Sequence, residues 1–285
     1  MRKSLRLLVL ASLVLWLCAG RAGAAAPISP DELPSSAALD LAVLRAVYPD
    51  AVAGMQRAPD GQLLLVLTDG ERLAYDDGQT RDVRQALEDP DMRTMLAQIY
   101  PLGPVDAVSA HPAPGFDPGR SRVQGFFAAL YGRTEAQVRA HCQSVRFDGH
   151  GALFSARHGA ARALARVAER IGALLPQHPQ WRNVLRPFGG TLAWRAIAGT
   201  DRLSMHSFGV AIDLNPHLPY WRSERRLETI PARRQAFPQE LVAAFEAEGF
   251  IWGGKWASFD LMHFEYRPEV ILKARVLRGE IVLPE

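Results

Sequence analysis

Cysteine is nearly absent from this sequence of 285 residues, in which only Cys18 and Cys142 occur. Cys18 lies in an N-terminal segment that we expect to be removed, so the mature chain would keep one cysteine and no internal disulfide. A single remaining cysteine also argues against a zinc site built from thiolates and against a thiol protease. We therefore expect Cys142 to be a small, buried apolar residue.

Long apolar runs are also absent after the first 25 residues. The chain begins with three basic residues in its first six positions, continues with an apolar run over residues 7–19, and then reaches Ala22, Gly23 and Ala24. This is the three-part layout of a secretory signal peptide. A membrane anchor is the alternative, but a spanning helix needs about 20 apolar residues. We expect residues 1–24 to be a cleaved signal.

A lipid-anchored protein is a further alternative for this segment. Lipid attachment at Cys18 would favour a small residue before it, and Leu17 is large. We therefore predict an exported protein, periplasmic or otherwise extracytoplasmic, with no stable membrane span after cleavage of the signal.

A strong excess of charge is lacking as well. The formal net charge is +3, and the predicted signal contains four of the basic residues and no acidic one, which leaves about −1 on the mature chain. We therefore expect no nucleic-acid partner. The basic cluster at residues 222–226 is interpreted as part of a solvated surface loop.

The remaining composition is that of a globular protein, with 48% hydrophobic and 22% charged residues. Hydrophobic spacing predicts helices over residues 38–47, 82–100 (with a break near Pro90), 123–131, 157–175, 238–248 and 268–277. Alternation predicts strands within residues 62–75 and over residues 191–196, 209–214 and 261–266. The mixed order predicts an α+β fold.

A segment dense in proline and glycine, residues 101–120, is interpreted as a boundary or long loop. We therefore predict a small N-terminal α/β lobe over residues 25–105 and a catalytic domain over residues 106–285.

Two segments combine histidine and aspartate with glycine, small and aromatic residues: SMHSFGVAIDLNP at 204–216 and WGGKWASFDLMHFEY at 252–266. The first places His206 just before a predicted strand and Asp213 on it, and the second places Asp260 and His263 at the start of another. If the two strands are neighbours, the four side chains can converge. Catalytic zinc takes three ligands from His, Asp and Glu and keeps a fourth position for water.

We predict that His206, Asp213 and His263 hold zinc and that Asp260 is the general base of a hydrolysis. A simpler interpretation is that Asp213 ends a strand and Asp260 caps a turn. Histidines outside the two segments are expected to be ordinary core or surface residues: His111, His141, His150, His158, His178 and His217.

SMHSFGVAID resembles the S-x-H-x-x-G-x-A-x-D motif of the zinc D-alanyl-D-alanine carboxypeptidase and L-alanyl-D-glutamate endopeptidase family, which includes VanY-like enzymes. DLMHFEY resembles the second motif of that family, an acidic residue three positions before a histidine. The resemblance covers much of residues 185–268. It implies the fold shared with hedgehog signalling domains: a small antiparallel sheet that carries the zinc site, flanked by helices.

The same resemblance implies a substrate among peptidoglycan stem peptides and an arginine that binds the substrate carbonyl or the developing oxyanion. Arg195 is the first candidate for that arginine, and Arg202 is the second because it lies closer to His206. The alternatives to a peptidase are a non-catalytic, zinc-containing module that binds the cell wall and a structural envelope protein.

Further residues near the motifs are candidates for substrate binding: Ser204, Trp252, Lys255 and Trp256. Lys255 could attract a substrate carboxylate, and the two tryptophans could form walls of the cleft. Glu265 shares strand parity with His263 and could orient that ligand. Ordinary packing or a solvated surface position is the simpler interpretation of each.

Overall fold

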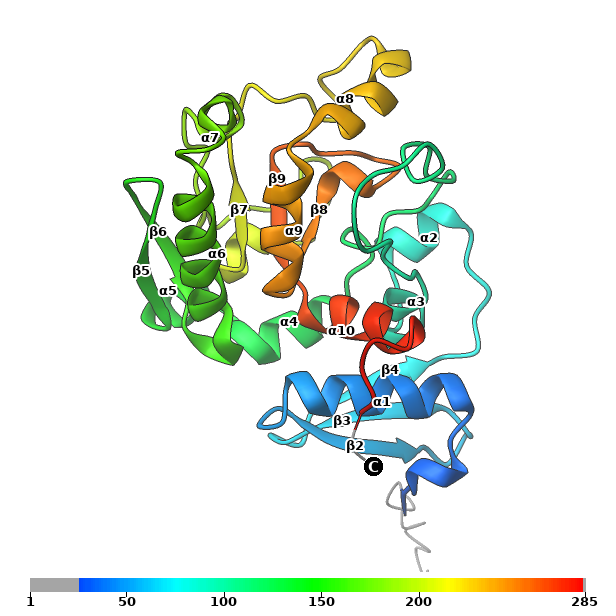
Figure 1. Ribbon diagram of the computed structural model, residues 1–285. Helices are drawn as coiled ribbons and strands as arrows, with labels where there is room; N and C mark the ends of the chain where they lie inside the picture. The colour runs from blue at the N-terminus through cyan, green and yellow to red at the C-terminus, as the bar shows by residue number, and fades with distance from the viewer. Residues whose placement is uncertain (1–25, 284–285) are drawn as a thin grey trace, which may run out of the picture.

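The N-terminal lobe is an antiparallel sheet covered on one face by a helix, and it lies below the larger body in Figure 1. This computed structural model describes residues 26–283, so the predicted signal peptide lies outside the described residues. The strands pair in the order β1-β2-β3-β4. The lobe consists of β1 (Ala26–Pro27), η1 (Pro30–Glu32), α1 (Ser35–Val47), β2 (Val52–Arg57), β3 (Leu63–Leu67) and β4 (Arg72–Asp76).

In this lobe, the alternating pattern of the sequence coincides with alternating burial along the strands. Residues 63, 65 and 67 of β3 are buried and alternate with partly exposed positions, because one face of the sheet packs on α1. The predicted helix and the two strands joined at Asp69-Gly70 are confirmed, whereas β2 was not predicted. Two short helices follow, α2 (Val83–Glu88) and α3 (Met92–Leu96). The break between them falls at Pro90, as predicted.

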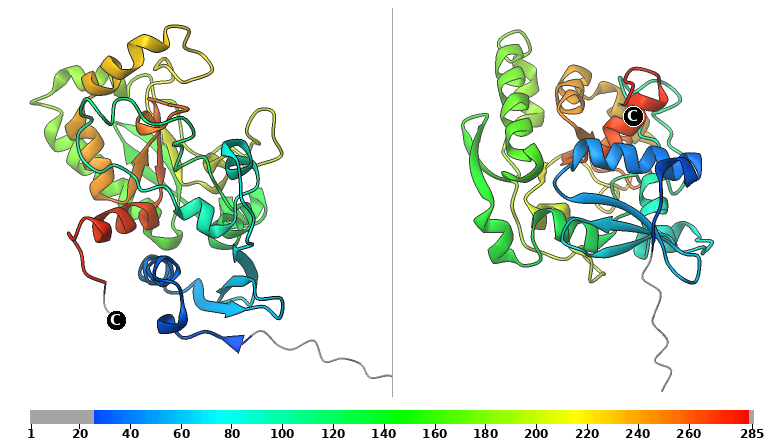
Figure 2. Two further views of the ribbon diagram at one scale, coloured as in Figure 1. Left: turned by 90° about the vertical axis from the view of Figure 1, so that its right-hand side faces the viewer. Right: turned by 90° about the horizontal axis from the view of Figure 1, so that it is seen from below.

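The larger body surrounds a second sheet, whose strands pair antiparallel in the order β7-β9-β8. Figures 1 and 2 show α6 and α9 beside this sheet, with the β5–β6 hairpin behind α6. Its strands are β7 (Ala211–Asp213), β8 (Phe250–Trp252) and β9 (His263–Tyr266), and the hairpin is β5 (Cys142–Phe147) and β6 (His150–Ser155). The helices of this body are α4 (Gln124–Tyr131), α5 (Glu135–Ala140), α6 (Ala160–Leu174), α7 (Arg182–Leu185), α8 (Ile230–Ala236), α9 (Gln239–Ala247) and α10 (Pro268–Leu277), with 3-10 turns η2 (Arg157–Gly159), η3 (Pro179–Trp181), η4 (Met205–Phe208), η5 (Leu227–Thr229) and η6 (Gly253–Lys255).

Two expectations for this body need correction. The strand predicted over residues 191–196 is an irregular segment, because it meets only isolated bridges, such as Ala196 with Leu203, and no continuous partner strand. The β5–β6 hairpin was missed. Its turn is Asp148-Gly149, and both residues have positive φ, the conformation that a two-residue hairpin turn requires.

The lobe and the larger body share one hydrophobic core across the predicted boundary at residue 105. Figure 1 shows α10 lying on α1, between the lobe and the second sheet. Two buried polar contacts join these helices: the Tyr48 hydroxyl donates to Glu269 at 2.7 Å, and Lys273 lies 2.5 Å from Asp40. The observed mixture of helices and small antiparallel sheets agrees with the predicted α+β class. Among the described helices, none has the length and apolarity of a bilayer span.

Candidate metal centre

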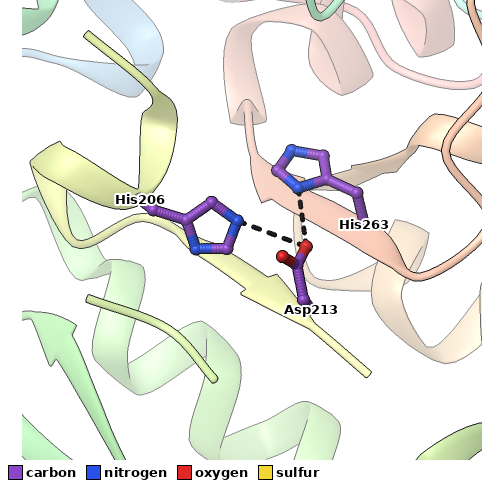
Figure 3. Close-up of side chains that lie close together, drawn as sticks. All are labelled: His206, Asp213 and His263. Atoms are coloured by element: carbon purple, nitrogen blue, oxygen red, sulfur yellow. Dashed lines mark hydrogen bonds and ion pairs between the residues drawn. The ribbon is translucent and has the colours of Figure 1, made fainter. Parts of the chain in front are cut away.

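The β7–β9 ladder brings the two sequence motifs together. In its register, Asp213 lies directly opposite His263, and Ala211 lies opposite Glu265. His206 reaches the same point from η4, a turn with Ser204 as its N-cap and Gly209, which has a positive φ of 67°, as its C-cap. Gly209 lets the chain reverse from η4 into β7. A pairing of two short strands thus places three predicted ligands side by side (Figure 3).

The three side chains present nitrogen and oxygen atoms to one another. His206 Nε2 lies 3.2 Å from Asp213 Oδ1, and His263 Nδ1 lies 3.0 Å from the same oxygen. The ligand atoms of the three residues all lie within 4.8 Å of one another. Two imidazole nitrogens with one carboxylate oxygen are a donor set typical of catalytic zinc, and they leave a coordination position open.

The other nitrogen of each imidazole is already engaged. His206 Nδ1 lies 2.5 Å from the carbonyl oxygen of Thr191, and His263 Nε2 lies 2.9 Å from Glu265 Oε2. Such partners set the tautomer and the orientation of a ligand histidine. In addition, His206 Nε2 is buried and makes no hydrogen bond within the described residues. The arrangement therefore fits a divalent cation.

The electrostatics of the cluster also favour a cation. Burial raises the pKa of Asp213, but the two imidazoles outweigh this effect and hold its pKa well below the ordinary value. Burial lowers the pKa of His263, yet its hydrogen bonds to Asp213 and Glu265 raise it to about 9. Negative charge that stabilises a proton on His263 will also stabilise a metal ion at this position.

Asp260 lines the same pocket as the three ligand candidates, and this pocket has a volume of about 100 Å³. Its Oδ1 is buried without a hydrogen bond in the described residues, and burial raises its pKa. Gly253 packs directly against Asp260, and only glycine fits there, because a Cβ at position 253 would lie 2.6 Å from the Asp260 carbonyl oxygen. A carboxyl group with a raised pKa, next to a metal site and free of partners, is suited to accept a proton and return it.

Glu265 connects the cluster to a buried chain of charges. Its carboxylate accepts from Arg122 at 2.8 Å and from Arg267 at 3.2 Å, and Arg267 in turn pairs with Glu269. Burial raises the pKa of Glu265, but Arg122 and His263 outweigh it and bring the pKa to about 2. Glu265 therefore stays ionised and can hold His263, as the strand parity indicated.

The structure separates the two arginines proposed from the sequence. Arg195 is exposed, lines the pocket, and its guanidinium makes no hydrogen bond within the described residues. Arg202 does not line the pocket. Its Nη1 donates to the carbonyl oxygens of Leu87 and Arg120, so it joins neighbouring loops. We therefore correct the assignment of Arg202 and retain Arg195.

Two of the four substrate-binding candidates also need correction. Lys255 is buried outside the pocket, where its ammonium pairs with Glu246 at 2.5 Å and donates to the carbonyl oxygens of Pro101 and Gly103. Trp252 is fully buried and donates from Nε1 to the Leu261 carbonyl oxygen. Both side chains are buried and engaged in these contacts, so neither is accessible to a substrate.

Ser204 and Trp256 do line the pocket. The Ser204 hydroxyl accepts from the backbone N–H of His206 at 3.4 Å and caps η4. Trp256 packs edge-to-face against His263, with ring centroids 5.6 Å apart. These two residues can shape the cleft, and each contacts one of the candidate ligand histidines.

Sequence reasoning missed Arg120 and Arg122, which line the pocket at the end of the segment interpreted as a boundary (residues 101–120) and just after it. Asp117 ties that segment to the loop before Asp260: its carboxylate accepts from the Ser258 N–H at 2.7 Å and from the Ser258 hydroxyl at 3.1 Å. The only available signal was the pattern Asp-Pro-Gly-Arg-Ser-Arg at 117–122, in which two arginines follow a turn. That pattern does not reveal which distant loop it contacts.

A second group of acidic residues lies in the lobe, formed by Asp76, Asp77 and Asp91. Arginines already neutralise it, because Arg81 pairs with Asp77 and Asp91, and Arg93 pairs with Asp76 at 2.5 Å. This group is therefore a weaker metal candidate than the histidine cluster.

Comparison with known proteins gives one match. Residues 198–266, about a quarter of the chain, match the family model described as D-alanyl-D-alanine carboxypeptidase. No curated protein and no solved structure gives a significant match. The matched segment contains the three ligand candidates and Asp260, whereas Arg195 and the 117–122 segment lie before it. The match supports a peptidase that acts on substrates related to peptidoglycan.

Proposed function

We propose that the protein is a zinc-dependent peptidase that hydrolyses peptide bonds in peptidoglycan stem peptides, as a D,D-carboxypeptidase or an L-Ala-D-Glu-type endopeptidase. The observation that carries the proposal is the convergence of two imidazole nitrogens on Asp213, in a pocket that Asp260 also lines. The family match over the same residues supports it.

Zinc would be held by His206 Nε2, Asp213 and His263 Nδ1, the atoms that face one another in Figure 3. A bound zinc ion supplies a Lewis acid and brings the pKa of an attacking water toward neutrality. Thr191 and Glu265 keep the imidazoles in place through their second nitrogens. This support limits the reorganisation that metal binding requires.

Asp260 performs the proton transfers in the proposed cycle. Its carboxylate takes the proton of the attacking water and returns it to the leaving amine. Burial raises the pKa of Asp260, which favours the protonated form that the carboxyl group takes after accepting the proton. Arg195 donates to the substrate carbonyl oxygen, where negative charge develops during the attack.

The predicted signal peptide would place this activity outside the cytoplasm, where peptidoglycan is found. We therefore propose an exported, extracytoplasmic hydrolase.

The test is incubation of purified protein and zinc with two defined peptides, a stem pentapeptide ending in D-Ala-D-Ala and a peptide containing L-Ala-γ-D-Glu, followed by mass spectrometry. We expect cleavage of one peptide, loss of activity with a chelator, and recovery with zinc. Asp260→Asn should reduce kcat by about 10²- to 10⁴-fold, the usual contribution of a general base, while the bound zinc measured by elemental analysis stays the same. Full activity in that variant overturns the role of Asp260. Binding of both peptides without cleavage by the unmodified protein favours a non-catalytic wall-binding module instead.

A further inference from the structure

Arg120 and Arg122 bring positive charge into the pocket from outside the matched segment. We propose that Arg120, backed by Arg122, forms a subsite that binds a substrate carboxylate next to the scissile bond. This inference rests on the proposed peptidase function and specifies which substrates it favours.

Arg120 is a rigid donor. Its Nε and Nη2 both donate to the Ser258 carbonyl oxygen, at 3.0 and 2.8 Å, and its guanidinium lies over the Trp256 ring at 5.2 Å from the centroid. Nη1 makes no hydrogen bond to any described residue. A guanidinium that is held on one edge and lines the pocket offers a preorganised donor to a ligand.

The charge of Arg120 has no direct carboxylate partner among the described residues. The nearby carboxylates are already engaged: Asp213 faces the two ligand histidines, and Glu265 pairs with Arg122 and Arg267. The charges of Asp260 and Asp117 also act on Arg120, and neither carboxylate forms an ion pair with it in the described residues. A partly buried guanidinium without a counter-ion favours an anionic ligand, because desolvation of an unpaired charge is costly.

Arg122 lines the same pocket and brings a second guanidinium group close to Arg120. It is almost completely buried, its Nη2 is paired with Glu265, and its Nε has no partner in the described part of the chain. The pocket lining has three guanidinium groups, those of Arg120, Arg122 and Arg195, and two carboxyl groups, those of Asp213 and Asp260. Glu265 does not line the pocket but pairs with Arg122, and a divalent cation at the histidine cluster would add two positive charges. The balance is positive, so an anion is favoured over a neutral group.

A carboxylate matches this donor better than other groups of a peptide do, because the planar fork of arginine pairs with its two oxygens. Two carboxylates of a stem peptide can lie beside a scissile bond: the C-terminal carboxylate of a leaving D-residue, and the α-carboxylate of a γ-linked D-Glu. Arg120 also lines the neighbouring grooves of about 410 and 460 Å³, which offer room for the rest of the chain. The shared requirement is therefore a free carboxylate next to the cleaved bond.

The experiment compares matched peptides with and without the carboxylate. One pair is the D-Ala-D-Ala peptide as free acid and as C-terminal amide, and the other is the L-Ala-γ-D-Glu peptide with its α-carboxylate free and amidated. For the zinc-loaded protein we expect kcat/KM to be at least about tenfold higher for the free acid in one pair, the size of effect that a charge-assisted hydrogen bond gives. The pair that shows the difference identifies the source of the carboxylate.

Arg120→Met should remove most of that ratio, and Arg120→Lys should retain part of it. The ratio compares two substrates on one protein sample, so a partly unfolded variant does not alter it. Arg225→Met is the matched control, because Arg225 is an exposed arginine that does not line the pocket, and it should leave the ratio unchanged. Equal kcat/KM values within both pairs, or an unchanged ratio in Arg120→Met, overturn the subsite.

Calorimetric binding of the same peptides to zinc-loaded Asp260→Asn separates this inference from the proposed function. If no peptide is cleaved by the unmodified protein, the peptidase proposal fails. The carboxylate subsite then stands if the free acid binds more tightly than the amide and Arg120→Met abolishes the difference. It is overturned if the acid and the amide bind equally.

Discussion

The pocket has two walls of different construction. The motif wall, residues 204–213 and 260–266, is held by the β7–β9 ladder, in which Asp213 and His263 are direct partners. The arginine wall, residues 116–122 together with Arg195, is irregular backbone held by side chains such as Asp117. The motif wall carries the candidate metal ligands, whose relative positions the paired strands fix, and the irregular wall carries the arginines that we propose to contact the substrate. This division is common where a rigid scaffold positions loops.

The largest effect is expected on the motif wall. Asp213→Ala removes the oxygen that both imidazoles face, so we expect loss of bound zinc and of all measurable activity. Elemental analysis and the peptide assay measure the two losses. Asp201→Ala, which changes an exposed aspartate outside the pocket, should keep both. Stoichiometric zinc in Asp213→Ala would show that the metal lies elsewhere.

A smaller effect, without metal loss, is expected on the other wall. Arg195→Met should lower kcat by about 10²- to 10³-fold, because it removes a donor to the developing oxyanion, and zinc should remain bound. Arg202→Met is the comparison variant, since Arg202 does not line the pocket and donates to the backbone carbonyl oxygens of Leu87 and Arg120. It should lower thermal stability and leave kcat nearly unchanged. The reverse pattern, with Arg202 essential and Arg195 dispensable, contradicts the placement of both residues.

The smallest effect is expected from changing Glu265, whose carboxylate contacts Nε2 of His263. Glu265→Gln keeps the shape of the side chain but weakens its hold on Nε2, so we expect zinc affinity to fall by about 10- to 100-fold, as is usual for such partners. Competition with a chelator measures the affinity, and activity should recover at saturating zinc. Glu269→Gln changes the same buried chain on the far side of Arg267, two ion pairs away from Glu265, and should lower stability without changing zinc affinity. Equal zinc affinities in the two variants would mean that Glu265 is only structural.

Much of the motif wall could be predicted because its signals are local. His206, Asp213, Asp260 and His263 occur in two short motifs, and the alternation around them predicted the strands that pair. The strand expected at residues 191–196 failed because pairing depends on a partner strand, which a local pattern does not supply. The hairpin at 142–155 was missed even though its Asp-Gly turn is a local signal.

Side-chain accessibility was harder to predict than element type. Lys255 lies two residues from Gly253, which packs against Asp260. Its ammonium nevertheless donates to carbonyl oxygens about 150 positions earlier in the chain. Arg202 is closer than Arg195 to His206 in sequence, but only Arg195 faces the pocket. Contacts between distant segments decide which of these side chains are accessible in the pocket, and spacing along the chain does not predict those contacts.

The sequence by itself determined which two short motifs carry His206, Asp213, Asp260 and His263, because residue type and short-range strand geometry place these side chains. It also determined the main helices through their hydrophobic period. Only the tertiary structure decided which arginines face the pocket, that Trp252 and Lys255 are buried, and that the proline- and glycine-rich segment forms a wall of the site. The physical reason is that these positions depend on long-range packing and hydrogen bonds between loops, whose partners lie far apart in the chain.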